Sequence, residues 1–184
     1  NYDGKYLIGG SLRRDGSSRF QADPYGWFPS VSIGWNVSEE AFWAPIKNFA
    51  SSFKLRASRG TTGNQNIQDY SYAGIITLQH DYIFGTDESL AIGAIQEAFP
   101  NPEVKWETSI SNNYGFDLGM WKNKLTMSLD YYTTSKKDML FPLEVSPSNG
   151  GGSNNSTITR NVGNMTNKGL EYAVKYRHAS GPLK

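Results

Sequence analysis

Few residues of this chain have the types and spacing that catalysis needs. Glu39 and Glu40 are adjacent carboxylates, and a carboxylate pair can serve as general acid and general base. The simpler interpretation is a short helix capped by Ser38, because carboxylates in the first helical turn are stabilised by the helix dipole. His80 and His178 are the only histidines, and their separation in sequence does not indicate a shared metal site. We therefore predict no catalytic residue and no metal ligand.

Composition excludes further chemistry. The chain has no cysteine, which rules out thiolate catalysis, disulfide bonds and cysteine-based metal sites. A net charge of +1 gives no reason to expect a nucleic-acid partner. The glycine-rich segment 60–64 lacks the lysine of a phosphate-binding loop, so we interpret it as a turn that ends a strand. We predict a protein without a cofactor that is not an enzyme.

The long segment 64–103 is a better candidate for a binding role than any residue of the chain is for catalysis. This segment is too long for an ordinary connection, and such segments are usually functional or mobile. Its rings Tyr70, Tyr72, Tyr82 and Phe84 offer stacking surfaces to a substrate or a partner protein. They could equally pack the segment onto itself, and the sequence leaves both interpretations open.

The elements that must position this segment are strands, and the clearest signal lies over 104–140. Apolar and polar residues alternate strictly along 104–120, then again from Leu125, with a tight turn at 121–124 between the two runs. Because successive side chains of a strand point to opposite faces, this pattern predicts a hairpin with one apolar and one polar surface. The residues that we expect to face lipid are Ile110, Tyr114, Phe116, Leu118, Leu125, Met127 and Leu129, with Leu170, Tyr172 and Val174 on the last strand.

Strand length indicates what the apolar surface meets. A strand over 104–120 would be roughly 56 Å long at about 3.3 Å per residue, whereas strands of soluble proteins usually have about 5 to 6 residues. Tilted by about 40°, such a strand would cross a bilayer. The mean hydropathy of -0.55 is compatible with this, because the strands of a membrane barrel give every second residue to a polar interior.

The rest of the chain repeats the pattern. Further strands are predicted over 5–13, 28–37, 53–58 and 169–177, the first of them interrupted by Gly9 and Gly10. We interpret 14–27, 64–103 and 142–161 as the long loops of one end, and 38–52 and 121–124 as the turns of the other end. Outer-membrane barrels place long loops outside and short turns in the periplasm.

This alternation predicts the end of the barrel at which each tryptophan lies. Trp35 and Trp121 are expected near the periplasmic interface, and Trp106 near the outer one, because aromatic side chains gather at both membrane interfaces.

An ordered series of short motifs resembles the SusC/RagA-type TonB-dependent outer-membrane transporters. The motifs lie at Lys5–Ile8, Arg14–Phe20, Phe28–Ser30, Gly34–Trp35, Ser38–Glu40 with Phe42, Leu55–Ser58, Gly60–Asn64, Asn101–Pro102, Trp106–Glu107, Asn161–Gly163 and Asn167–Glu171. Together they span nearly the whole chain. Arg59 departs from the family pattern, which has an aromatic residue there, and Gln21 replaces a glycine.

The resemblance implies a barrel of about 22 strands in the bacterial outer membrane, with an N-terminal plug. It also implies energy coupling to TonB, a SusD-like surface lipoprotein as partner, contact with membrane lipid and lipopolysaccharide, and import of an oligosaccharide or a peptide. We expect residues 1–184 to form part of one all-β, antiparallel barrel domain with about six strands, the plug and remaining strands lying elsewhere in a longer protein.

A soluble β-sandwich that binds carbohydrate is the alternative, since its strands alternate in the same way. A sandwich predicts short strands with turn signals about every 8 to 12 residues. The long hairpin over 104–140 favours the barrel.

Overall fold

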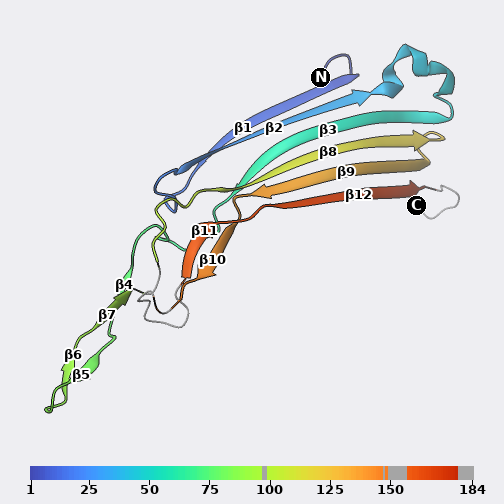
Figure 1. Cartoon of the computed structure of the whole chain (residues 1–184). Coiled ribbons are helices and arrows are strands. Elements are labelled where there is room, and N and C mark those ends of the chain that lie inside the picture. Colours follow the sequence, from blue (N-terminus) through green and yellow to red (C-terminus); the bar gives the residue numbers. More distant parts are fainter. Residues whose placement is uncertain (97–98, 147, 149–156, 178–184) are drawn as a thin grey trace, which may run out of the picture.

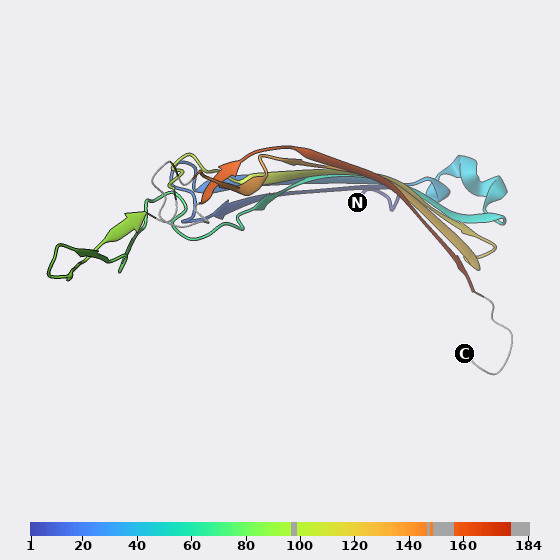
Figure 2. The same ribbon diagram turned by 60° about the horizontal axis from the view of Figure 1, so that its bottom comes forward.

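A computed structural model of the chain describes residues 1–96, 99–146, 148 and 157–177. The described residues are organised around one six-stranded sheet, in which each strand is antiparallel to its neighbours. In spatial order the strands are β1 (Tyr6–Gly16), β2 (Tyr25–Asn36), β3 (Ala50–Asn64), β8 (Glu107–Met120), β9 (Leu125–Lys137) and β12 (Met165–Tyr176). Figure 1 shows this meander, and Figure 2 shows that the sheet is curved rather than flat.

The connections differ at the two ends of the sheet (Figure 1). At one end, which we call the short-turn end, lie the link from β2 to β3 and the tight turn from β8 to β9. In that tight turn Trp121, Lys122 and Asn123 have φ angles of 51°, 56° and 61°, in the left-handed region. The β1–β2 loop and two longer insertions lie at the opposite, long-loop end. The two longest connections and the tight turn lie at opposite ends, as predicted (Figure 1). The prediction is wrong for the other two connections, because the β2–β3 link (37–49, 13 residues) is longer than the β1–β2 loop (17–24, 8 residues).

Strands β1, β2, β3 and β12 are longer than the sequence pattern indicated, with 11 residues in β1 and 15 in β3. The segment 60–64 does not end the strand as a turn, because Gly60 pairs with Ser111 and Asn64 with Glu107. Gly9 and Gly10 do not interrupt β1, and β12 begins at Met165 rather than at Gly169. Backbone pairing with a neighbouring strand overrides the weak strand preference of glycine at these positions.

Strand β8 begins at Glu107, later than expected, because the residues before it pack into a small core. Val104 is fully buried and Trp106 is 8% exposed, and both belong to one buried cluster with Phe20 and Phe28. The Trp106 ring lies 4.9 Å from that of Phe20 and 5.5 Å from that of Phe28, measured between centroids. The prediction that Trp106 belongs to an interfacial aromatic girdle is therefore wrong, since a girdle residue must be exposed to the interface.

The link from β2 to β3 contains two short 3-10 helices, η1 (Val37–Glu39) and η2 (Ala41–Ile46). Neither has a side-chain cap, so the expected capping role of Ser38 is wrong. Ser38 is buried within η1 instead. No helix among the described residues is long and apolar enough to cross a membrane.

Both long insertions contain strands of their own. The segment 64–103 forms two small antiparallel ribbons, in which β4 (Ile76–Leu78) pairs with β7 (Ala94–Gln96), and β5 (Tyr82–Phe84) pairs with β6 (Ser89–Ala91). We call residues 76–96 the arm; Figure 1 shows it projecting away from the sheet, with β5 and β6 at its tip. The second insertion pairs β10 (Leu140–Glu144) with β11 (Thr157–Asn161), and most of the connection between them lies outside the described residues.

Candidate functional site

The register of the sheet gathers apolar side chains on one face, which we call the apolar face. Neighbours in one row across the strands are Tyr6, Trp35, Leu55, Phe116, Leu129 and Tyr172. The next row toward the long-loop end contains Ile8, Ile33, Ala57, Tyr114, Tyr131 and Leu170. Every residue that was expected to face lipid lies on this face, because strand residues two apart share a side.

The apolar face changes character at the following row. Arg59, Asn112, Thr133 and Lys168 are successive neighbours across β3, β8, β9 and β12. Ile110 lies one row beyond them, where its neighbours are Thr61 and Ser135. The continuous apolar band therefore ends before Ile110, whereas the other residues expected to face lipid lie inside it.

The opposite, polar face carries an ion-pair network centred on Arg56. The Arg56 guanidinium donates to both oxygens of Asp117, at 2.8 and 3.1 Å, and to Oδ2 of Asp130 at 3.0 Å. These three side chains come from β3, β8 and β9, and only the register brings them together.

Gly115 makes this network possible. It is the direct neighbour of Arg56 on one side and of Asp130 on the other, so it stands between the two charges that meet across β8. A Cβ atom at this position would overlap Oδ1 of Asp130. The missing side chain thus leaves the opening through which Arg56 and Asp130 reach each other.

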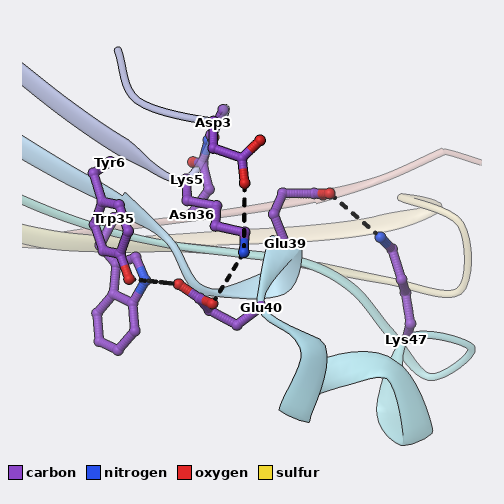
Figure 3. Close-up of polar contacts among 9 residues, drawn as sticks. Asp3, Lys5, Tyr6, Trp35, Asn36, Glu39, Glu40 and Lys47 are labelled. Carbon is purple, nitrogen blue, oxygen red and sulfur yellow. Dashed lines mark hydrogen bonds and ion pairs between the residues drawn. The ribbon is translucent and has the colours of Figure 1, made fainter.

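A second polar cluster lies at the short-turn end, around Glu40 (Figure 3). Tyr6 Oη and Trp35 Nε1 donate to Oε1 of Glu40 at 2.7 and 3.2 Å, and Lys5 Nζ lies 3.4 Å from Oε2. The hydrogen bond from Tyr6, followed by that from Trp35, lowers the pKa of Glu40 below its usual value, and pairing with Glu40 raises the pKa of Lys5. The carboxylate ties the first two strands to the turn that follows them.

This geometry does not support acid and base catalysis by the two glutamates. Glu39 points away from Glu40 and pairs with Lys47, with 3.5 Å between Oε2 and Nζ (Figure 3). Glu40 is held by strand donors, so the two carboxylates do not face a common space. Trp35 and Trp121 both lie at the short-turn end, where they were expected.

The four aromatic residues singled out in segment 64–103 form two separate pairs. Tyr70 and Tyr72 contact each other with ring centroids 6.2 Å apart, and Tyr82 and Phe84 with centroids 5.0 Å apart. The first pair precedes the arm, whereas the second lies on β5 at its tip. The rings of each pair pack on each other, while Tyr82 and Phe84 are 67% and 61% exposed.

The sequence pattern missed the aliphatic residues of the arm. Ile83, Leu90 and Ile92 are exposed by 58%, 65% and 83%. A two-stranded ribbon has no second layer to cover its apolar side chains, which is why these residues remain in solvent. The signal in the sequence was the density of Ile and Leu in a segment otherwise read as a loop.

One curved sheet with an apolar and a polar face, and with long insertions at one end only, has the architecture of a membrane β-barrel wall. The family model described as "TonB dependent receptor-like, beta-barrel" matches residues 1–183. The chain belongs to this family of outer-membrane receptors, and the sandwich alternative is wrong.

Named relatives agree with the family. The chain is 35% identical over 178 residues to TonB-dependent receptor P3 of Formosa agariphila, covering 96% of this chain and 17% of that protein. It is 32% identical over 173 residues to TonB-dependent receptor SusC of Bacteroides thetaiotaomicron, covering 92% of this chain and 17% of SusC. The chain thus spans about a sixth of the length of these relatives.

Solved structures give the same result. The RagAB peptide importer in its "closed-closed" state superposes with a TM-score of 0.82 and 28% sequence identity, over 98% of this chain and 19% of that one. The siderophore receptor PirA from Pseudomonas aeruginosa shares the fold at a TM-score of 0.60 and 16% identity. The SusC/RagA-type resemblance predicted from the sequence is confirmed.

Proposed function

We propose that this chain is part of the barrel wall of a SusC-like transporter that imports an oligosaccharide or a peptide across the bacterial outer membrane. In this proposal residues 1–184 belong to one barrel domain, and TonB supplies energy through regions of the protein outside this chain. The observation that carries the proposal is a sheet with one apolar and one polar face that matches a TonB-dependent receptor barrel. Its strands are long, with 11 residues in β1 and 15 in β3. The likeness to the RagAB peptide importer supports a peptide substrate, and the oligosaccharide is the alternative that the SusC/RagA-type resemblance implies.

In this arrangement the apolar face meets membrane lipid and the polar face lines the lumen. The short-turn end then faces the periplasm, and the arm projects outside the cell. The Arg56 network suits a lumen wall, because charged side chains are tolerated there and are costly against lipid.

The arm is the part of the chain that we assign to recognition. Lipid-facing side chains meet only lipid, so selectivity has to come from the lumen and the outer loops. The exposed aromatic residues Tyr82 and Phe84 at the tip offer an apolar contact surface. We assign to them contact with a SusD-like surface lipoprotein or with the substrate itself.

Shortening the arm in the full-length receptor tests this assignment. Replacement of residues 71–98 by a glycine and serine linker should leave barrel assembly intact, because surface loops tolerate changes in length. Nutrient uptake, or co-purification of the lipoprotein, should fall. Unchanged uptake and unchanged co-purification, with normal receptor levels in the membrane, would refute a role for the arm.

A finer variant separates the two sides of β5. Tyr82 and Phe84 lie on one side of this strand and Ile83 on the other. If the aromatic side is the contact surface, Tyr82→Ser with Phe84→Ser should reduce uptake or co-purification. Ile83→Ser removes a side chain of similar exposure and serves as the matched control.

A further inference from the structure

Charge is divided unequally between the two faces of the six-stranded sheet. The acidic residues of its strands all lie on the polar face: Asp15, Glu107, Asp117, Asp130 and Glu171. The strand residues of the apolar face include no carboxylate, yet they include four cations, Arg14, Arg59, Lys137 and Lys168. A surface that only contacts hydrocarbon has no use for these cations.

All four cations lie toward the long-loop end, beyond the apolar band. Arg59 and Lys168 bracket Asn112 and Thr133 in one row, which places their Cα atoms about 14 Å apart at about 4.8 Å per strand. Arg14 lies nearer the end of the sheet, with its guanidinium carbon 4.0 Å from the centroid of the Tyr25 ring. The four residues form a belt, which we call the basic belt.

The protein itself does not neutralise Arg59 and Lys168. Both side chains are exposed, and neither forms an ion pair within the described part of the chain. Their position is nonetheless suited to a membrane boundary, since cations on the lipid face of a barrel are costly at the bilayer centre and nearly neutral at the interface. The belt therefore presents uncompensated positive charge where lipid headgroups lie.

A hollow of about 190 Å³ adjoins Arg59 on the side of the apolar band. Val31, Ile33, Ala57 and Tyr114 contribute to its lining, together with Asn112. It exists because Ala57 is small while its neighbours Ile33 and Tyr114 are large. The Arg59 cation and the Asn112 amide thus lie side by side in one row, and the hollow extends from them toward the apolar band, as an acyl chain extends from a lipid headgroup.

We propose that Arg59, Asn112 and Lys168 bind the phosphate of a phosphorylated glycolipid in the outer leaflet, with an acyl chain in the hollow over Ala57. Lipopolysaccharide carries this chemistry in its phosphorylated glucosamine lipid anchor. Arg59 forms a bidentate contact with phosphate, Lys168 adds a point charge, and the Asn112 amide hydrogen-bonds to phosphate or sugar. This site rests on the proposed function, because the apolar face must meet lipid for the belt to reach a headgroup.

The test uses the full-length receptor in nanodiscs, with binding of bisphosphorylated lipid A measured by native mass spectrometry. Arg59→Gln with Lys168→Gln should weaken retention of this lipid by roughly tenfold or more, since each cation near a membrane surface adds to the free energy of binding anionic lipid. Lys54→Gln with Lys175→Gln removes the same charge from the polar face and should leave retention unchanged. Equal retention by the wild type and the Arg59 and Lys168 variant would overturn the proposal.

Two further binding measurements define the ligand. Dephosphorylated lipid A should be retained as weakly by the wild type as bisphosphorylated lipid A is by the double variant, and inorganic phosphate alone should not compete. Equal retention of both lipids, or competition by free phosphate, would contradict a phosphorylated lipid site. Ala57→Leu should reduce retention by filling the hollow while leaving the cations in place.

Failure of this site is distinguishable from failure of the proposed function. Each variant is checked for membrane insertion and nutrient uptake, neither of which requires the basic belt. Normal insertion and uptake with no change in lipid A retention would refute the lipid site alone. Failure of the wild-type receptor to insert with its apolar face toward lipid would instead refute the proposed function.

Discussion

At the scale of single residues, Gly115 shows how a missing side chain supports a charged network. Arg56 and Asp130 belong to strands that do not pair with each other, and they meet only across the Cα of Gly115. No motif in the sequence indicates this contact, because it depends on the register of three strands. The strand alternation predicted that these residues share a face, but only the structure shows that Arg56 pairs with Asp130.

Gly115→Ala should destabilise the full-length receptor. The added Cβ overlaps Oδ1 of Asp130 and forces this carboxylate away from Arg56, which costs roughly 1 to 3 kcal/mol for a charge-assisted hydrogen bond. Gly60→Ala on β3 is the control, since a Cβ there meets only Ser30 Cβ at 3.6 Å. Unfolding titrations in lipid or detergent measure both; equal stability of the two variants would show that Gly115 has no such role.

Glu40 predicts a dependence of stability on pH. Its pKa in the folded protein is lowered from 4.5 by donors from Tyr6 and Trp35, so the contribution of this carboxylate is present above 4.5 and is lost as the pH falls through the lower folded value. Glu40→Gln should therefore lower stability at neutral pH and flatten the loss below 4.5.

The control for this pH dependence is Glu39→Gln. Among the described residues Glu39 pairs with Lys47 alone, and both side chains are about half exposed, so the variant should follow the wild-type profile. Unfolding midpoints measured from neutral to acidic pH compare the three proteins. Parallel profiles for the wild type and Glu40→Gln would contradict the role of Glu40.

At the scale of elements, the alternation of apolar and polar residues predicted the faces of the strands well, whereas the sequence predicted the ends of the strands poorly. The faces of β8, β9 and β12 were predicted residue by residue, because a period of two survives regardless of what the face contacts. Val104 and Trp106 fit the same alternation but are buried in a core with Phe20 and Phe28. Alternation does not distinguish a strand residue from a neighbouring apolar residue that turns into a local core.

The arm could not be predicted for a related reason. Strands of three residues, such as β5, are too short for periodicity to stand out from a loop. The aromatic pairs were identified as candidates from composition alone, whereas the exposure that makes them available depends on the absence of a covering layer.

The assignment of the two faces is testable with adjacent residues of β9. Leu129→Arg places a cation on the face proposed to meet lipid and should cost roughly 2 to 4 kcal/mol near the bilayer centre. Ser128→Arg directs the same side chain to the polar face and should be tolerated. Unfolding titrations of the full-length receptor in lipid rank the two variants, and the opposite ranking would reverse the inside and outside of the sheet.

At the scale of the whole molecule, the described chain is an open sheet. Apolar side chains such as Ile8, Tyr172 and Val174 are exposed by 76%, 79% and 58%, and β1 and β12 each have one edge without a partner in the described chain. Exposed apolar surface and free strand edges both promote association.

We therefore expect residues 1–184 alone not to form a stable soluble monomer. Sedimentation in detergent-free buffer should show aggregates or heterogeneous oligomers, and lipid or detergent should be needed to disperse them. A monodisperse species with sharp, dispersed amide resonances in detergent-free buffer would contradict the membrane assignment.

The meander also bears on the order in which the sheet assembles. Only one pairing, β3 with β8, joins strands separated by a segment as long as 65–106. Closing a flexible loop costs entropy that grows with its length, by about 0.6 kcal/mol for each doubling. The ribbons of the arm pair within that segment, β5 with β6 and β4 with β7, and so shorten the loop that remains open.

If the arm pairs from its tip inward, it brings Asn64 and Glu107 toward each other before the long strands meet. The β3–β8 ladder can then grow from its long-loop end, where those two residues are the last pair of the register. The segment that projects farthest from the sheet would in this way act as an internal nucleus for the pairing that joins its two halves.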